Sequence, residues 1–148
     1  MAELNEILQN VEIFDGLEKA ELEQVAQICR ERKLHAGDYI TTQGEAGDEL
    51  YIVTQGFVEV LLGEGATPAR VVVNLGAGQI IGEMALLDQG PRSASVRAVD
   101  EPTIVQVINR DDFDLICQGN YRIGYIVMRN IAADLSFKLR HRNLSEMG

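Results

Sequence analysis

The residues of this chain whose types could do chemistry lie within one short stretch: Gly82, Glu83, Arg92 and Ser93. A glycine lets the backbone approach a ligand without a Cβ, and a carboxylate accepts hydrogen bonds from hydroxyl groups. The planar guanidinium of an arginine can bind two phosphate oxygens at once, and the serine beside it adds a hydroxyl. Together these residue types predict a pocket for a small anion.

The residues between the glutamate and the arginine must position both side chains. Residues 84–87 can wind into a single helical turn, and the unpaired N–H groups at the start of such a turn attract phosphate. Pro91 restricts the backbone just before Arg92. From Ser93 onward the residues alternate as in a β-strand. We therefore expect a turn, a loop and a strand, with Glu83 and Arg92 facing one site.

A simpler interpretation is that Glu83 and Arg92 form a buried ion pair that only fixes a loop, since such pairs are weak indications of anything more. The glycine before the acid, the helical turn and the hydroxyl of Ser93 favour an anion site. No nucleophile paired with a base and no Walker-type loop accompanies these residues. The sequence therefore predicts a binding site and not an enzyme.

Composition narrows the classes of function further. The 148 residues suffice for one domain, and a net charge of −10 argues against direct DNA binding. Cys29 and Cys117 lack metal-ligand spacing and are expected to be buried thiols, and His35 and His141 are too few for a metal cluster. We expect no metal and no cofactor.

The N-terminal segment carries acidic residues where a signal peptide carries lysines, and no apolar run is long enough to span a membrane. We therefore expect a cytoplasmic protein without a membrane span.

Glycines divide residues 33–108 into short alternating runs, which is typical of an antiparallel β-barrel. Strands are expected at residues 34–40, 49–53, 56–62, 69–75, 95–99 and 103–108, with a polar hairpin tip at 64–68. Helical periodicity predicts N-terminal helices within residues 1–32, with Asp15 and Glu18 as a capping box, and C-terminal helices within residues 109–148. The expected architecture is a single domain over residues 1–148, mainly β with flanking helices.

The helix expected over residues 121–143 is too apolar to stand alone. One seam steps by alternating four and three residues as in a coiled coil: Tyr121, Tyr125, Met128, Ala132, Leu135 and Leu139. A second apolar stripe consists of Ile123, Val127 and Ile131. Because a helix with two apolar faces usually packs on its own domain and on a partner, we expect a homodimer through this helix.

Residues 81–98, which read IGEMALLDQGPRSASVRA, resemble the phosphate-binding cassette of the cyclic-nucleotide-binding domain family. This family includes the sensor domains of catabolite activator protein and of kinase regulatory subunits. Gly-Glu-x-Ala-Leu-Leu, a loop, and then Pro-Arg-x-Ala-x-Val-x-Ala align without a gap, and the resemblance extends over residues 13–142. It implies an antiparallel double-stranded β-helix, a jelly-roll-like barrel with N-terminal helices and a long C-terminal helix.

The resemblance also implies which residues hold the ligand. The cassette residues would be Gly82, Glu83, Met84, Ala85, Arg92, Ser93 and Ala94. In the family, the glutamate and the glycine backbone bind ribose, which corresponds here to Glu83 and Gly82. Arg92 and the N–H groups of Ala85 and Ser93 would bind the cyclic phosphate.

The base is expected to lie against Val71, Val73 and Ile81. Ile81 stands where the family usually has an aromatic residue, so ligand contact there is expected to be weaker. Ser93 follows the arginine, where relatives that favour cyclic GMP tend to carry threonine and those that favour cyclic AMP often carry alanine. We expect a preference for cyclic AMP with measurable binding of cyclic GMP.

The function implied is that of a non-catalytic cyclic-nucleotide receptor or regulatory module. It would signal by repositioning its C-terminal helix toward an effector protein that the sequence does not name. One alternative is a dimerisation or protein-interaction module with a vestigial nucleotide pocket, and another is a barrel enzyme.

Overall fold

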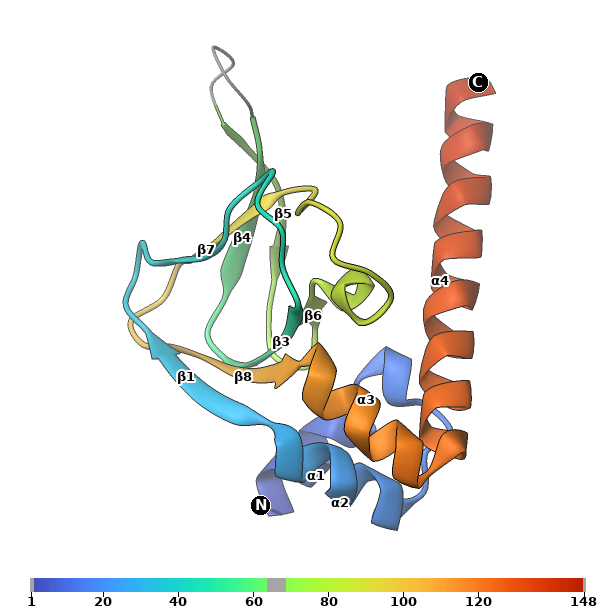
Figure 1. The fold of residues 1–148 in the computed structure, drawn as a ribbon. Helices are drawn as coiled ribbons and strands as arrows, with labels where there is room; N and C mark the ends of the chain where they lie inside the picture. Colours follow the sequence, from blue (N-terminus) through green and yellow to red (C-terminus); the bar gives the residue numbers. More distant parts are fainter. Residues whose placement is uncertain (1, 64–68, 148) are drawn as a thin grey trace.

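The computed structural model describes residues 2–63 and 69–147 (Figure 1), so the hairpin tip expected at 64–68 lies outside the described residues. The elements follow one another as α1 (Ala2–Gln9), the 3-10 helix η1 (Glu12–Phe14), α2 (Lys19–Ile28), β1 (Arg30–Leu34), β2 (Tyr39–Thr41), β3 (Glu49–Gln55), β4 (Val58–Leu62), β5 (Arg70–Leu75), β6 (Ile80–Ile81), the 3-10 helix η2 (Glu83–Leu86), β7 (Ser95–Ala98), β8 (Thr103–Asn109), α3 (Arg110–Gly119) and α4 (Tyr121–Met147).

The strands form two antiparallel sheets of four strands each, in the orders β1-β8-β3-β6 and β2-β7-β4-β5. Side chains from both sheets meet in one buried cluster, because alternate residues of a strand face the same side. Its members are Leu34, Tyr51, Val53, Val58, Ile81, Val96, Ala98, Val105 and Val107. The mainly β, jelly-roll-like fold is confirmed, although the described strands form two facing sheets and not one closed barrel.

The helices pack on the outer face of the first sheet. Leu50, Ile52 and Ile108 alternate with the inward residues of β3 and β8 and join a second core with the helices. We call this second cluster the helical core; it also contains Phe14, Phe113 and Leu86. Figure 1 shows α1, α2 and α3 gathered at one end of the β-structure, with α4 rising alongside it. Since Leu86 is the last residue of η2, the expected binding site is packed directly against the helices.

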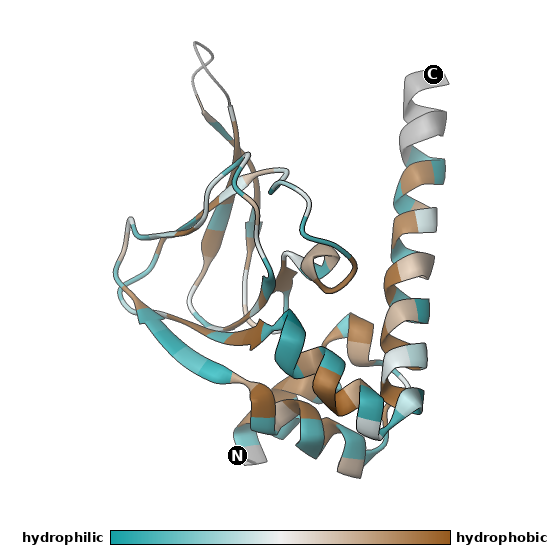
Figure 2. Cartoon of the chain, viewed as in Figure 1, coloured by the Kyte–Doolittle hydropathy of each residue, from teal (hydrophilic) through white to brown (hydrophobic). Residues whose placement is uncertain are grey.

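Two expectations about the first strands are wrong. The strand expected at residues 34–40 is two strands, because Gly37 has a φ of 92° and residues 35–38 form a turn closed by a 3.0 Å bond from the N–H of Asp38 to the carbonyl of His35. Residues 30–32, expected to be helical, belong to β1, which pairs with β8 along its whole length. Figure 2 shows β1 as a hydrophilic strand, so it lacks the alternation by which a strand is recognised.

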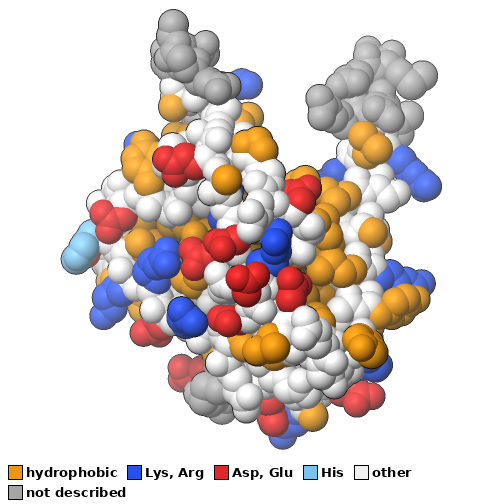
Figure 3. Space-filling view, viewed as in Figure 1, with side chains coloured by type: hydrophobic (Ala, Val, Ile, Leu, Met, Phe, Trp, Pro, Cys, Tyr) orange, Lys and Arg blue, Asp and Glu red, His pale blue; other side chains and the backbone are white. Residues whose placement is uncertain are grey.

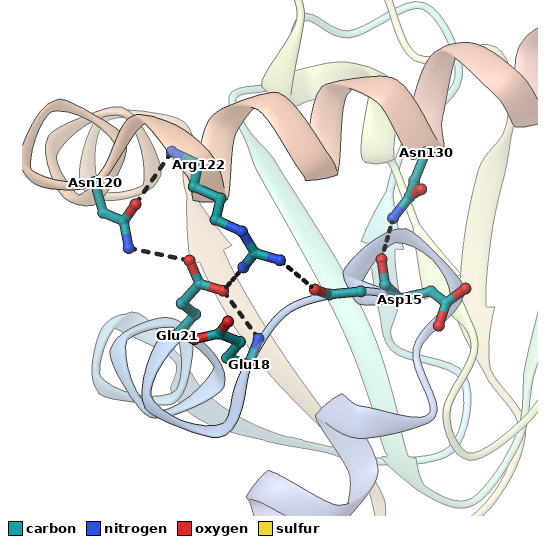
Figure 4. Close-up of polar contacts among 7 residues, drawn as sticks. Asp15, Glu18, Glu21, Asn120, Arg122 and Asn130 are labelled. Atoms are coloured by element: carbon teal, nitrogen blue, oxygen red, sulfur yellow. Dashed lines mark hydrogen bonds and ion pairs between the residues drawn. The ribbon is translucent and has the colours of Figure 1, made fainter.

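The expected capping box also lies elsewhere. The N-cap of α2 is Glu18, and its box partner is Glu21, whose Oε1 accepts a bond of 2.9 Å from the N–H of Glu18. Glu21 is 5% exposed and pairs with Arg122 of α4 (Figure 4). Asn120 donates to its other oxygen at 3.1 Å. The carboxylate that caps α2 thus also anchors the start of α4.

The two apolar stripes of α4 have different surroundings. Ile123, Val127 and Ile131 are buried in the helical core. Of the seam residues, Met128 and Leu135 pack partly against this core, whereas Tyr121, Tyr125, Ala132 and Leu139 are exposed. The division of the chain into a single domain stays a prediction.

Candidate functional site

The site begins where β6 turns into η2. Gly82 lies between them with a φ of 78° and a ψ of 31°, a left-handed conformation that favours glycine. The helical turn expected after it is confirmed: the N–H of Ala85 donates to the carbonyl of Gly82 at 3.0 Å, and that of Leu87 to Met84 at 2.9 Å. The N–H of Ala85, expected to face a phosphate, is therefore already bonded within the turn.

A neighbouring loop holds the backbone of Arg92 in place. The N–H of Arg92 donates to the carbonyl of Glu45 at 2.8 Å, and its carbonyl accepts from the N–H of Gly44 at 2.9 Å. Ala46 and Pro91 form an isolated antiparallel bridge beside these bonds. Both the N–H and the carbonyl of Arg92 are thus hydrogen-bonded, which fixes the backbone from which its side chain extends.

The guanidinium of Arg92 occupies a seat formed by two glycines and an aromatic ring. Its Nη2 donates to the carbonyl of Glu49 at 2.7 Å, and its Cζ lies 5.8 Å from the centre of the Tyr51 ring. A Cβ at Gly47 or at Gly82 would overlap guanidinium nitrogens. Because a guanidinium has five N–H donors, the bond to Glu49 leaves others for an anion.

Tyr51 keeps its neutral form in this seat. Burial raises the pKa of the Tyr51 phenol, and the nearby Glu49 carboxylate raises it further. The hydroxyl donates to that carboxylate at 3.1 Å. The ring therefore presents an uncharged face to the arginine.

A cavity of about 300 Å³, which we call the cassette cavity, opens in front of this seat. Its lining residues are Gly47, Gly82, Glu83, Met84, Ala85, Asp88, Gly90, Pro91, Arg92 and Ser93. It brings together six of the seven cassette residues predicted from the sequence. Of the others, Gly47, Asp88 and Gly90 were missed; the Oδ1 of Asp88 accepts from the N–H of Gly90 at 2.9 Å and so shapes the loop.

A smaller cavity of about 160 Å³, the strand cavity, adjoins it and shares Gly82, Arg92 and Ser93 with it. It contains the remaining cassette residue, Ala94, and the predicted base contact Ile81. Four apolar lining residues were missed: Val60, Leu75, Ile80 and Val96. The alternation of residues along β4 could have identified Val60 as a lining residue, because its neighbour Glu59 faces the opposite side of the sheet.

The predicted base contacts Val71 and Val73 lie on β5 and are not among the residues that line the two cavities. Val73 is paired with Val60, and directly opposite side chains share a face of the sheet. Both valines are about half exposed, at 48% and 46%. Val73 therefore lies next to a residue that lines the strand cavity, and both valines keep an exposed apolar surface.

Glu83 has a neighbour that sequence reasoning did not find. Its side chain is 18% exposed, and its Oε1 lies 3.9 Å from the Nζ of Lys138 on α4. Figure 3 shows a hydrophobic strip along the flank of α4 that faces the β-structure, with acidic and basic side chains gathered on the neighbouring surface. The C-terminal helix therefore reaches the candidate site through a charged contact.

Several other expectations concern groups outside the site. Cys29 and Cys117 are free and partly buried against the helical core, and burial raises their pKa values to about 12 and about 11. In residues 2–63 and 69–147, no three His, Cys, Asp or Glu side chains are grouped as metal ligands would be. The helices of that same part of the chain include none with the length and apolar character of a membrane span.

Comparison with known proteins gives a consistent result. Residues 31–120 match the family of the cyclic nucleotide-binding domain. The chain is 33% identical over 132 residues to the cyclic AMP receptor protein of Thermus thermophilus, covering 89% of this chain and 59% of that protein. It is 32% identical over 124 residues to a cyclic nucleotide-gated potassium channel of Rhizobium etli, covering 84% of this chain and 33% of the channel.

Among solved structures, the regulatory domain of Toxoplasma gondii PKA in complex with cAMP matches with a TM-score of 0.77 and 30% identity. The match covers 91% of this chain and 49% of that one. The chain thus spans between about a third and three fifths of the length of these two curated relatives.

Proposed function

The chain belongs to the cyclic nucleotide-binding domain family, and from this premise we propose that it is a non-catalytic receptor for cyclic AMP that reports binding through its C-terminal helix. One observation carries the proposal: Glu83 and Arg92 open into the same cavity of about 300 Å³. A carboxylate suits ribose hydroxyls and a guanidinium suits a cyclic phosphate, so both ends of one ligand find a partner. The volume is at the lower end of the range typical of small-molecule sites.

In the proposed complex, Arg92 and the N–H of Ser93 bind the phosphate, and Glu83 with the Gly82 backbone binds ribose. The N–H of Ala85 joins the phosphate contacts by sharing its bond to the carbonyl of Gly82. Met84 and Ala94 complete the wall of the site. The base lies in the strand cavity against Ile81, Val71 and Val73, and covers part of the exposed surface of the two valines.

Cyclic AMP is the proposed ligand, with cyclic GMP as a weaker second ligand. The names of a receptor protein and of a kinase regulatory domain among the relatives refer to cyclic AMP. Ser93 lines both cavities, and its hydroxyl is the group that we expect to admit cyclic GMP.

The proposed output is a movement of α4 relative to the β-structure. Leu86 is 4% exposed at the end of η2 and packs in the helical core with Phe113, Ile123 and Val127. A ligand that tightens η2 therefore changes the packing on which α4 rests, and favours one helix position over another. The effector that reads this position is a partner protein or a further domain.

We also propose a homodimer through α4. Tyr125 and Leu139 are 63% and 59% exposed on the seam, and a two-fold pairing of helices would cover both.

Two free cysteines fit a reducing compartment, so we place the receptor in the cytoplasm.

Isothermal titration with cyclic AMP, cyclic GMP and linear 5′-AMP tests the proposed function. We expect micromolar or tighter binding of cyclic AMP, on the order of −8 kcal/mol, with the nucleotide recovered unchanged. Arg92→Ala should weaken it by about 2–5 kcal/mol, or about 30- to 5,000-fold, because a desolvated phosphate loses its charge-assisted partner. Arg97→Ala is the matched control, since Arg97 pairs with Glu59 away from both cavities.

The outcomes separate the candidate functions. An affinity within twofold of wild type in Arg92→Ala would show that the phosphate is bound elsewhere. A dimer that binds none of the nucleotides would identify an interaction module with a vestigial pocket. Turnover of the nucleotide would identify an enzyme.

A further inference from the structure

Glu83 lines two cavities of similar size. One is the cassette cavity, and the other is a second cavity of about 300 Å³, which we call the helix cavity. The helix cavity lies between η1, the end of β5, the residues around β6, and α4. Its lining includes Glu12, Glu83, Asp134 and Lys138. Lys138 lines the helix cavity and not the cassette cavity, whereas Arg92 and Ser93 line the cassette cavity and not the helix cavity; Glu83 lines both.

Lys138 is held by carboxylates on three elements. Its Nζ lies 2.8 Å from Oδ2 of Asp134, one turn earlier on α4, and 3.9 Å from Oε1 of Glu83. The ion pair with Asp134 raises the pKa of Lys138, and attraction to Glu83 and to Glu12 on η1 raises it further. Lys138 therefore stays charged over the physiological pH range. At 3.9 Å the contact with Glu83 is a loose ion pair, which leaves the carboxylate oxygens able to accept other hydrogen bonds.

The position of Lys138 on α4 gives this contact its importance. The first half of α4 is fixed to the N-terminal helices by Arg122, by Asn130 and by the buried side chains down to Ile131 (Figure 4). Lys138 lies about two turns further along the helix, where the side chains are exposed. It therefore connects the less firmly held half of α4 to the cassette.

We propose that Lys138 is a positioning residue for ribose recognition. It holds the Glu83 carboxylate from the helix cavity, so that the carboxylate is ready to accept the ribose 2′-hydroxyl in the cassette cavity. This inference rests on the proposed function and adds a residue to it. Because the same carboxylate contacts both α4 and the sugar, binding of the 2′-hydroxyl and docking of this half of α4 favour each other by linkage.

The role can be distinguished from simple stabilisation of the fold. Lys138 is 62% exposed at its side chain, so the ion pair adds little to the stability of the domain. Its effect should instead be confined to ligands that use Glu83. A ligand without the 2′-hydroxyl should bind equally well with or without Lys138.

The experiment compares cyclic AMP with 2′-deoxy cyclic AMP by isothermal titration in four proteins: wild type, Lys138→Met, Lys138→Arg and Arg140→Met. We expect Lys138→Met to weaken cyclic AMP about two- to fivefold and to leave 2′-deoxy cyclic AMP unchanged. Lys138→Arg keeps the positive charge and should retain most of the wild-type affinity for cyclic AMP. Arg140→Met removes one positive charge from the same exposed part of α4 and should change neither ligand.

Three results would overturn the inference while leaving the receptor function standing. In Lys138→Met, the first is an equal loss of affinity for cyclic AMP and 2′-deoxy cyclic AMP, and the second is an unchanged affinity for both. The third is tighter binding of cyclic AMP, which would mean that the lysine competes with ribose. Wild-type protein that binds neither ligand would instead overturn the proposed function, and with it this role of Lys138.

Discussion

The seat of Arg92 allows its placement to be tested without removing its charge. Gly47 is the position to change, because its backbone is outside the left-handed region and an alanine there is not strained. The added Cβ would overlap Nε and Nη2 of Arg92, so the guanidinium must leave its seat. This movement breaks the 2.7 Å bond to the carbonyl of Glu49 and displaces the guanidinium from its place at the cassette cavity.

The expected cost follows from the interaction that the guanidinium makes with a phosphate. A hydrogen bond to a charged group contributes about 1.5–3 kcal/mol, so Gly47→Ala should weaken cyclic AMP binding by about 10- to 150-fold. The fold should be retained, because only the end of a flexible side chain has to move. Isothermal titration measures the affinity, and thermal unfolding should show a melting temperature within a few degrees of wild type.

Gly119→Ala is the matched control. Gly119 ends α3, and a Cβ there meets no atom within 4 Å. The control should bind cyclic AMP like wild type. If Gly47→Ala also binds within twofold of wild type, the observed seat of the guanidinium is not the one used for phosphate, and the reasoning is refuted.

Two further predictions concern ligand choice and assembly. Ser93→Ala should weaken cyclic GMP by about 2- to 12-fold in a competition assay and leave cyclic AMP unchanged, since one neutral hydrogen bond is lost; a larger effect on cyclic AMP would contradict the proposed role of this hydroxyl. Tyr125→Asp should weaken the homodimer by roughly tenfold or more in sedimentation velocity, because a charge enters the apolar seam. Leu115→Asp, at an equally exposed leucine of α3, should leave the dimer intact, and a wild-type monomer would remove the dimer proposal.

The parts of the fold that the sequence predicts well are those set by neighbouring residues. Gly82, the turn after it and the alternation that begins near Ser95 are local patterns, and each appears where it was expected. Gly37 was a local signal too, but the alternation around it continued from Leu34 to Ile40 and concealed the turn. β1 carries no alternation because four of its five residues are charged and exposed, so its assignment depends on pairing with β8.

The base contacts are harder to predict because they depend on two strands at once. Val71 and Val73 could be selected as apolar residues of a strand, but the face that they present depends on the register with β4, where a bulge lies between Val60 and Leu61. The same register places Val60 at the strand cavity. Short-range patterns could therefore select apolar residues of β5 but not Val60 on the neighbouring strand, and the base contacts at Val71 and Val73 stay a prediction.

The contact between Glu83 and Lys138 lies beyond any local pattern. The two residues come from η2 and α4, and their approach requires that Ile123, Val127 and Ile131 first bury one stripe of α4 in the helical core. That burial sets the rotation of the helix, and the helical repeat then places Asp134 and Lys138 on a side that faces the cassette. Lys138 therefore acquires Glu83 as a neighbour only through this packing. Any ligand group that reorients Glu83 consequently acts on α4 beyond its fixed half, which is where a partner could detect the change.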